Sequence, residues 1–334
     1  MTELGRGHVR PVERGDMTAH RPLYVLALFL CGIAASQGIE LFVNRILRPD
    51  AEEITWISEA VMAGGFAVVT WLWVRLRETQ IALTDLERAQ IVAETQLTIA
   101  ARVQASLLPV LPGPSNGIGW YAAVEPAGKI GGDYYDFLVL PDERMCVVLG
   151  DVSGKGVGAA VFLANVRATL RAIARDATHP RTVVSDLSAA LLADSASGLY
   201  VTCIVAIVDP RARSMVYVNA GHPAGVLWNA KGARGLRVGG PPAGLLRDAT
   251  FEEEHLTFGD GDLVVFVSDG ITEALDAGGE GVVEAIAAQV TQAERPTPEG
   301  VCSLLLSAAR RGPGPRGVDG WTDDRTAVAF GVIA

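Results

Sequence analysis

The segment LGDVSGKGVGAAV at residues 149–161 passes from an apolar run into glycines and then into a helix-like stretch. A glycine-rich turn between a strand and a helix often binds nucleotide phosphates through its backbone N–H groups. The other interpretation is that Asp151, at the expected end of the strand, carries the chemistry. These two interpretations lead to different folds and functions for the chain.

The spacing of the glycines argues against a nucleotide-binding loop. The phosphate-binding loop of nucleotide hydrolases has a glycine, four residues and then Gly-Lys-Ser/Thr. Here three residues separate Gly150 from Gly154, and Gly156 replaces the hydroxyl residue that would hold magnesium. The segment GGDYYDF at 131–137 likewise differs from the GGDEF signature of diguanylate cyclases, because Tyr-Tyr replaces Glu-Phe. A nucleotide-binding signalling enzyme is therefore the least favoured interpretation.

Acidic residues form a more consistent pattern. Each of four aspartates stands at the expected end of a strand, beside a glycine or a second acid: Asp133, Asp151, Asp269 and Asp323. Carboxylates in such turns, without clustered cysteines, are typical ligands of Mg²⁺ or Mn²⁺. Converging carboxylates repel one another, and shared dications compensate for that repulsion. Each aspartate alone is also a common turn or cap residue, but the set favours a two-cation site for attack of water on a phosphate ester.

Composition limits the partners. The 334-residue chain has a formal net charge of −10 and a mean hydropathy of +0.29. No run of Lys or Arg lies outside the N-terminal segment, so we expect no nucleic-acid partner. The four cysteines, at positions 31, 146, 203 and 302, have no CxxC spacing, which predicts buried free thiols in a reducing compartment.

Two apolar stretches in residues 22–75, at about 22–41 and 54–74, carry much of the hydrophobicity. Both are close to the length that crosses a bilayer, and tryptophans at 56, 71 and 73 suit its interfaces. Arginines precede the first stretch and follow the second, which predicts a hairpin with both ends in the cytoplasm. We therefore expect a multi-pass inner-membrane protein whose tail, residues 1–21, is cytoplasmic. A signal peptide followed by a buried helix is the alternative.

Residues 76–108 are predicted to form a helical signalling linker. Apolar residues recur there at heptad-like spacing, and two of the positions in this pattern are occupied by the polar residues Gln90 and Gln104. The pattern stops at Pro109. We favour a coiled coil that joins two copies as a homodimer, and a single helix packed on the next domain is the alternative.

The remainder, 109–334, has strand-like runs joined by short turns, with helical patterns at about 156–176, 180–194, 279–293 and 297–311. This pattern predicts an α+β domain in which helices cover antiparallel strands.

Six motifs cover the chain from about residue 101 onward: QASLLP at 104–109, GGDYYDF at 131–137, GDVSGKG at 150–156, NAGHPAG at 219–225, SDGITEA at 268–274 and DDRT at 323–326. In this order they resemble the PPM, or type 2C-like, metal-dependent protein serine/threonine phosphatases, in the bacterial branch of SpoIIE and RsbU. The resemblance implies a β-sandwich flanked by helices, with two Mn²⁺ or Mg²⁺ ions at one edge. It also implies direct attack of a bridging hydroxide on phosphoserine or phosphothreonine, without a phosphoenzyme.

The resemblance also implies roles for individual residues. Asp133 would bridge the two ions, Asp151 and the backbone carbonyl of Val152 would serve the first, and Asp269 and Asp323 would hold the second. Asp324 would not bind a cation itself but would lie next to the residues that do. The further candidates near the site are Gly132, Ser153, Lys155 and His222.

One departure from the family concerns the proton for the leaving alkoxide. Many eukaryotic members of the family that this chain resembles have a histidine two residues after the aspartate that matches Asp151, where this chain has Ser153. Either a metal-bound water or another group, such as His222, must supply the proton, and a structural turn histidine is the alternative for His222. Lys155 either meets substrate phosphate or is a solvated loop lysine. Thr202, within a long apolar run, is predicted to lie in the core.

The usual substrate in this branch is a phosphorylated anti-sigma-factor antagonist, so the resemblance implies release of a sigma factor as the downstream effect. A different class of function is a catalytically silent regulatory scaffold with the same fold. Loss of a metal aspartate would indicate a scaffold, and all four are present in this sequence.

Overall fold

The computed structural model describes residues 32–34, 36–38, 41–42, 52–128, 130–154, 156–193, 198–277, 279, 281–293, 296–313, 316–317, 320–321 and 323–332. Contacts divide the chain into two compact units, residues 1–91 and 92–334. The predicted tail, Cys31 and Lys155 lie outside the described residues, as does most of the first predicted span.

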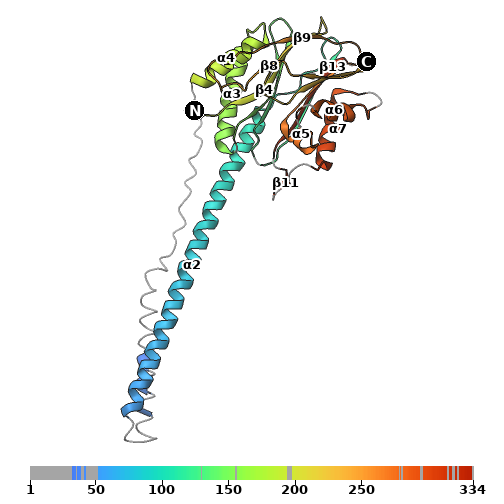
Figure 1. Ribbon diagram of the computed structural model, residues 1–334. Helices are drawn as coiled ribbons and strands as arrows, with labels where there is room; N and C mark the ends of the chain where they lie inside the picture. The colour runs from blue at the N-terminus through green and yellow to red at the C-terminus, as the bar shows by residue number, and fades with distance from the viewer. Residues whose placement is uncertain are drawn as a thin grey trace, which may run out of the picture. The chain divides into compact units, whose positions relative to one another are not determined.

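A single helix forms most of the described part of the first unit. This helix, α2 (Glu52–Leu107), runs without interruption through the second predicted span and the predicted linker (Figure 1). Its large apolar side chains are exposed, with Val61 at 68%, Val69 at 64% and Trp71 at 60%. Where the apolar stretch ends, the guanidinium groups of Arg75 and Arg77 lie over the rings of Trp71 and Trp73, at 5.8 and 5.2 Å.

Two described helices are long and apolar enough to cross a membrane, Ala60–Leu107 and Val157–Ala174. The second of these lies in the second unit, where its buried face packs into the core. Of the first predicted span, residues 32–34, 36–38 and 41–42 are described, and they are helical.

The second unit contains two mainly antiparallel sheets packed face to face. One, sheet A, has the order β1 (Ile118–Glu125), β13 (Arg325–Val332), β10 (Leu263–Val267), β6 (Gly225–Asn229) and β7 (Gly232–Leu236). The other, sheet B, has the order β2 (Asp133–Val139), β3 (Met145–Val152), β4 (Val201–Asp209), β5 (Ser214–Ala220) and β8 (Gly239–Gly240), and β9 (Glu254–Thr257) pairs with β5. A separate short pair joins β11 (Arg316–Gly317) to β12 (Gly320–Trp321).

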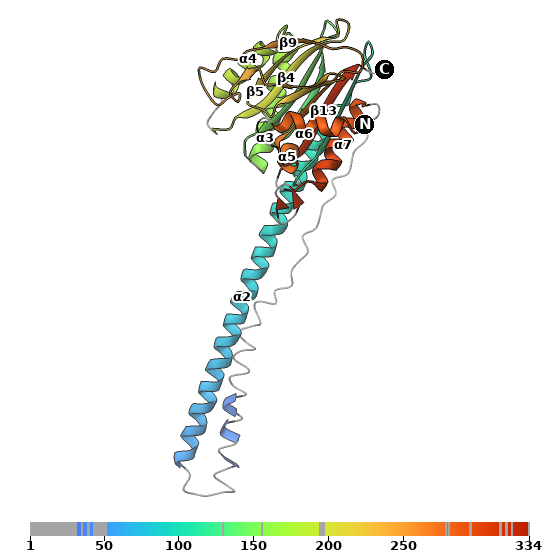
Figure 2. The same cartoon turned by 45° about the vertical axis from the view of Figure 1, so that its right-hand side comes forward.

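Helices cover the outer faces of both sheets (Figures 1 and 2). The helices α3 (Val157–Ala174) and α4 (Pro180–Ala193) lie on sheet B, whereas α5 (Asp269–Ala274), α6 (Gly281–Val290) and α7 (Pro298–Arg311) lie on sheet A. The predicted α+β sandwich flanked by helices is therefore confirmed. The four long helices agree with the predicted ranges within a few residues, whereas α5 was not predicted.

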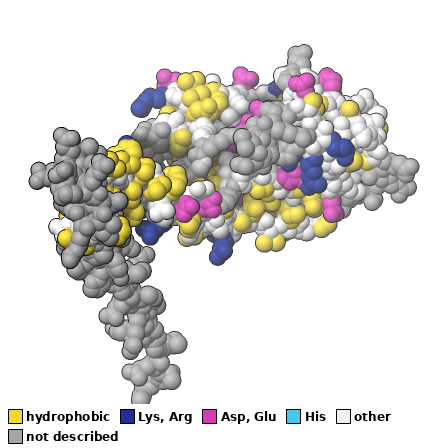
Figure 3. Space-filling model, turned by 90° about the horizontal axis from the view of Figure 1, so that it is seen from below, with side chains coloured by type: hydrophobic (Ala, Val, Ile, Leu, Met, Phe, Trp, Pro, Cys, Tyr) yellow, Lys and Arg dark blue, Asp and Glu magenta, His cyan; other side chains and the backbone are white. Residues whose placement is uncertain are grey.

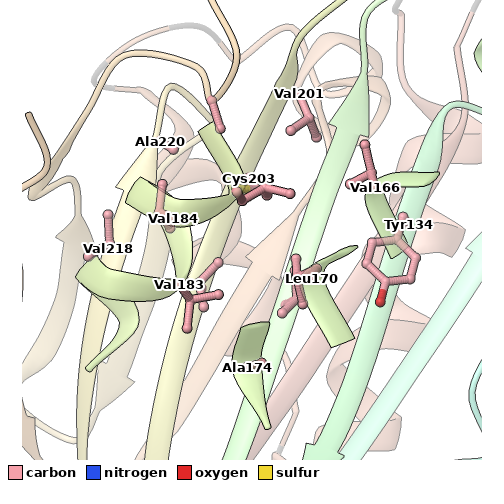
Figure 4. Packing of buried hydrophobic residues seen from close by; sticks show 14 of the residues in the cluster. Tyr134, Val166, Leu170, Ala174, Val183, Val184, Val201, Cys203, Val218 and Ala220 are labelled. Atoms are coloured by element: carbon pink, nitrogen blue, oxygen red, sulfur yellow. The ribbon is translucent and has the colours of Figure 1, made fainter. Parts of the chain in front are cut away.

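The apolar run of β4 explains why this fold forms. Its side chains alternate between two buried faces: Cys203 and Val205 pack toward α3 and α4, and Ile204 and Ala206 pack between the sheets. A strand buried on both faces needs a continuous apolar run rather than polar alternation. Figure 4 shows the outer cluster, in which Leu170 of α3 and Val183 of α4 lie against this strand. Each such side chain contributes about 1.5–3 kcal/mol on burial.

Candidate active site

Sheet B places two of the predicted aspartates side by side. Asp133 begins β2 and lies directly opposite Asp151, near the end of the antiparallel neighbour β3. Directly opposed residues project from the same face of a sheet, and like charges in such a pair repel. Burial raises the pKa of Asp133 well above its usual value, and the nearby carboxylates of Asp151 and Asp324 raise it further. The hydroxyl of Thr326 donates a hydrogen bond to Asp133 and partly offsets this effect.

Sheet A supplies the remaining carboxylates at one end. Because β10 and β13 are antiparallel neighbours, the residues after β10 and those before β13 lie at the same end of the sheet. Asp269 follows β10 and opens α5, and Asp323 precedes β13. The two segments approach so closely that a Cβ on Gly270 would lie 2.0 Å from the carbonyl oxygen of Asp324. The glycine in SDGITEA is therefore required by contact between two backbones.

Asp324 holds the loop that leads into β2. Its carboxylate accepts hydrogen bonds from the backbone N–H groups of Ala127, at 2.7 Å, and Gly132, at 2.6 Å. Burial raises the pKa of Asp324, and these backbone donors oppose that rise. Asp323 is less buried and lines a pocket, and one of its oxygens accepts from the Asp324 N–H at 3.0 Å. Both acids line this pocket, and their separate roles as ligand and as support remain predictions.

Two pockets open beside these carboxylates. The first, of about 530 Å³, is lined by Asp151, Val152, Asp323 and the glycines of the loop before β2, among others. The second, of about 440 Å³, is lined by Asp151, Ser153, Asp269 and His222, among others. Asp151 therefore faces both spaces. Across the described part of the chain, no three His, Cys, Asp or Glu side chains are grouped closely enough to hold a cation as they stand.

The donors at this edge nevertheless fit divalent cations. A Cβ on Gly132 would lie 2.5 Å from Oδ1 of Asp151 and 3.3 Å from the carbonyl oxygen of Val152. Glycine thus leaves open a space that two oxygen donors face, and oxygen donors are those that Mg²⁺ and Mn²⁺ prefer. Carboxylates that face one space repel one another, and divalent cations bound between them would offset that repulsion.

His222 and Thr202 form one wall of the second pocket. Oγ1 of Thr202 lies 3.0 Å from Nδ1 of His222. The prediction that Thr202 lies in the core is wrong, because β4 pairs it with Asp151 at the strand end and its half-buried side chain lines the pocket. Burial lowers the pKa of His222 to about 3, so its ring is neutral at neutral pH. The neutral ring favours the interpretation of His222 as a structural turn histidine over that of a proton donor.

Ser153 accepts a hydrogen bond from the Tyr200 N–H at 2.9 Å and so orders the loop that follows Asp151.

The structure adds one residue that the sequence did not assign to the site. The side-chain amide of Gln104, near the end of α2, donates to the carbonyl of Gly131 at 2.5 Å and accepts from its N–H at 3.0 Å. The heptad pattern placed Gln104 at a coiled-coil seam, whereas here its side chain holds the loop before Asp133. The available signal was the QASLLP motif, whose polar first residue interrupts an otherwise apolar spacing.

Gln104→Ala is expected to weaken Mn²⁺ binding by about tenfold. Residues that orient a metal ligand are commonly worth about 10–100-fold in affinity, and Gln104 acts through the backbone, so the lower figure applies. Mn²⁺ titration of the full chain in detergent measures this change. Gln90→Ala, an exposed position of the same helix, is the matched control and should bind as the unmodified chain does. Equal affinity in both variants would contradict the role given to Gln104.

Two packed sheets, covered by helices and ending in a group of aspartates, define a PP2C-like phosphatase fold. The SiaA-PP2C domain of Pseudomonas aeruginosa superposes with a TM-score of 0.59 at 20% identity, covering 72% of this chain and 98% of that one. The RsbU and RsbW domains of a Mycobacterium tuberculosis protein superpose with a TM-score of 0.55 at 27% identity, covering 67% and 62%.

The chain belongs to the SpoIIE family, because the family model for stage II sporulation protein E matches residues 141–332. Among curated relatives, the phosphoserine phosphatase RsbU of Bacillus subtilis is 26% identical over 54% of each chain. Protein IcfG of a Synechocystis strain is 27% identical over 54% of this chain and 33% of its own length. The phosphoserine phosphatase RsbP of Bacillus subtilis is 23% identical over 53% of this chain and 45% of its own. The chain thus spans only 33–54% of the curated relatives it matches.

Proposed function

We propose that this chain is a metal-dependent protein phosphatase that hydrolyses phosphoserine or phosphothreonine on a regulatory protein. The observation that carries the proposal is that Asp133 and Asp151 of one sheet and Asp269 and Asp323 at the end of the other lie at one edge of the sandwich, where hydrogen bonds join the two sheets and two pockets open. Membership of the SpoIIE family and relatives named phosphoserine phosphatases support it. Two divalent cations, Mn²⁺ or Mg²⁺, are the proposed cofactors.

Each residue at the edge has a task in the proposed mechanism. Asp133 would bridge the cations, Asp151 and the Val152 carbonyl would hold the first, and Asp269 and Asp323 would hold the second. Bound there, the cations would activate water for attack on phosphorus and stabilise the charge that develops on the phosphoryl oxygens. The side chain of Asp324 and the glycine loop would keep the ligands in place.

The experiment that tests this function is hydrolysis of p-nitrophenyl phosphate by the full chain in detergent. Activity should require Mn²⁺ or Mg²⁺ and should disappear on addition of EDTA, because the aspartates alone cannot activate water at this edge. Hydrolysis that is unaffected by EDTA would contradict the two-cation mechanism. No hydrolysis under any metal condition would instead favour the scaffold alternative.

The proposed substrate is a phosphorylated anti-sigma-factor antagonist. It rests on the resemblance to the SpoIIE and RsbU branch, in which proteins of that kind are the usual substrates. Its dephosphorylation would release a sigma factor. A homodimer formed through residues 76–108 would carry a signal to the active site, and the bond between Gln104 and Gly131 gives that helix a physical route to the loop before Asp133.

We also propose that residues 22–75 anchor the chain in the inner membrane as a two-helix hairpin. In support, residues 60–74 of α2 carry no charged side chain and expose large apolar ones, and Arg75 and Arg77 follow directly and lie over tryptophan rings. Exposed apolar surface of this length needs lipid or protein to cover it, and aromatic residues beside arginines are typical of the membrane interface. The N-terminus and the catalytic domain would both be cytoplasmic.

A reporter fused after residue 77 should behave as cytoplasmic in cells. Alkaline phosphatase at that position is expected to be inactive and a fluorescent protein that folds only in the cytoplasm to be bright, because the arginines on both sides of the hairpin keep its ends inside. A fusion after residue 48, in the predicted outer connection, should give the opposite pattern and serves as the control. Periplasmic activity of the first fusion would overturn the topology.

A further inference from the structure

A pocket next to the active site is not used by the proposed mechanism. It has a volume of about 410 Å³, and its walls come from the segment after β5, the β7–β8 connection and the residues around α5 and α6. It shares three wall residues, Gly221, His222 and Pro223, with the pocket that faces Asp151 and Asp269. The two pockets therefore adjoin along this wall.

Apart from Arg237 and the buried Nε2 of His222, which has no hydrogen-bond partner among the described residues, the walls of this pocket of about 410 Å³ offer little free polar surface. The Asn219 side chain is fully engaged, because its amide donates to the Pro223 and Leu236 carbonyls and its oxygen accepts from the His222 N–H. The Thr272 hydroxyl donates to the carbonyl of Asp269. The rest of the wall is small or apolar, as in Ala224, Gly240, Ala277 and Val282. Such walls suit an extended peptide segment but do not select a side chain.

Arg237 is the charged residue of this wall. Its exposed guanidinium donates one long hydrogen bond, of 3.3 Å, to the Gly279 carbonyl. Among the residues that the structure describes, no carboxylate lies within ion-pair distance of Arg237, and no other Lys or Arg lines either pocket. On the face drawn in Figure 3, the described Lys and Arg side chains are interspersed with Asp and Glu and do not form one continuous patch. An arginine whose guanidinium makes this one hydrogen bond has further donors that suit it to bind a carboxylate.

We propose that Arg237 and its pocket bind an acidic residue of the phosphoprotein substrate, close in sequence to the phosphorylated serine or threonine. The inference rests on the proposed phosphatase function and adds a substrate class to it, namely a phosphosite flanked by Asp or Glu. The shared wall of Gly221, His222 and Pro223 supports it, because a peptide held with its phosphate beside Asp151 and Asp269 can extend over that wall. The carboxylate would accept two hydrogen bonds from the guanidinium, the geometry that arginine offers.

The test uses the full chain in detergent with Mn²⁺ and a series of phosphoserine peptides. Each peptide carries a single Glu at one position between four residues before and four after the phosphoserine, and its matched partner carries Gln there. At one position, or at two adjacent positions, the Glu peptide should have a KM about threefold to tenfold lower than that of its Gln partner, with kcat unchanged. Arg237→Ala should remove this preference, Arg237→Lys should retain part of it, and Arg237→Glu should reverse it.

Two controls separate this inference from its alternatives. Arg247→Ala, an exposed arginine outside both pockets, should leave the preference intact. The rate of p-nitrophenyl phosphate hydrolysis should be equal in the unmodified chain and in every Arg237 variant. If an Arg237 variant instead hydrolysed p-nitrophenyl phosphate and the peptides more slowly by the same factor, Arg237 would bind the phosphoryl group itself, and the inference would be overturned. A preference that survives Arg237→Ala, or no preference for Glu at any position, would overturn it while leaving the phosphatase function standing. Absence of metal-dependent hydrolysis of both substrates would overturn the proposed function and this inference together.

Discussion

Asp151→Asn is expected to reduce kcat for p-nitrophenyl phosphate by more than about 100-fold, because residues that merely orient a metal ligand already contribute about 10–100-fold. Asp151 lies directly opposite Asp133 and lines both pockets at the edge of the sandwich. Asparagine keeps the size of the side chain and removes the charge that a cation requires. The fold should be preserved, since the change also removes a like-charge repulsion with Asp133.

Initial rates at saturating Mn²⁺, together with a thermal unfolding curve, measure this effect. Asp176→Asn, at an exposed position after α3, is the matched control and should retain the unmodified rate. The proposed site would be contradicted if Asp151→Asn were folded and hydrolysed substrate at the unmodified rate.

Arg171→Ala is expected to lower the free energy of unfolding of the phosphatase unit by about 3 kcal/mol. The second aspartate of GGDYYDF, Asp136, is 0% exposed and is paired with Arg171 of α3 through contacts of 2.7 and 3.1 Å. Without Arg171 the buried carboxylate keeps the hydrogen bonds from the Tyr134 hydroxyl and the Phe137 N–H but loses its ion-pair partner. The figure is at the lower end for buried pairs, because the Arg171 side chain is 40% exposed and water screens part of the interaction.

For a unit of this size the change corresponds to a fall in Tm of about 6–12 °C. Arg175→Ala, one turn further on in the chain and exposed, has no hydrogen bond or ion pair to lose among the described residues and should change stability by less than about 0.5 kcal/mol. Calorimetry of both variants tests the difference. Equal melting temperatures of the two variants would mean that the ion pair between Asp136 and Arg171 does not contribute to the free energy of unfolding.

Local patterns predicted much of the domain. The apolar runs and the helical spacing identified the strands and the long helices, because burial on one or two faces leaves a direct periodic signal. Three cysteines, Cys146, Cys203 and Cys302, are free and buried as predicted. The sequence does not predict the short helix α5, because six residues are too few to show a helical period and the apolar run before Asp269 places that residue at the end of a strand.

Contacts between distant segments could not be predicted from local patterns. Thr202 looked like a core residue because its neighbours on both sides are buried, yet it ends a strand beside Asp151 and faces a pocket. In GGDYYDF, the two aspartates look alike in sequence, but Asp133 lies at the carboxylate edge and Asp136 forms a structural ion pair with a helix. Gln104 resembled a coiled-coil position until its partner, Gly131, was known.

Calorimetric titration of the full chain with Mn²⁺ tests the central claim most directly, because the claim is that the four aspartates of this edge hold the cations used for phosphate hydrolysis. The account predicts two Mn²⁺ ions per unmodified chain. It predicts only one in Asp269→Asn, since Asp269 serves a single cation, and no measurable binding at the edge in Asp133→Asn, which removes the bridging ligand. Two ions bound with unchanged affinity in both variants, or no binding to the unmodified chain, would contradict it.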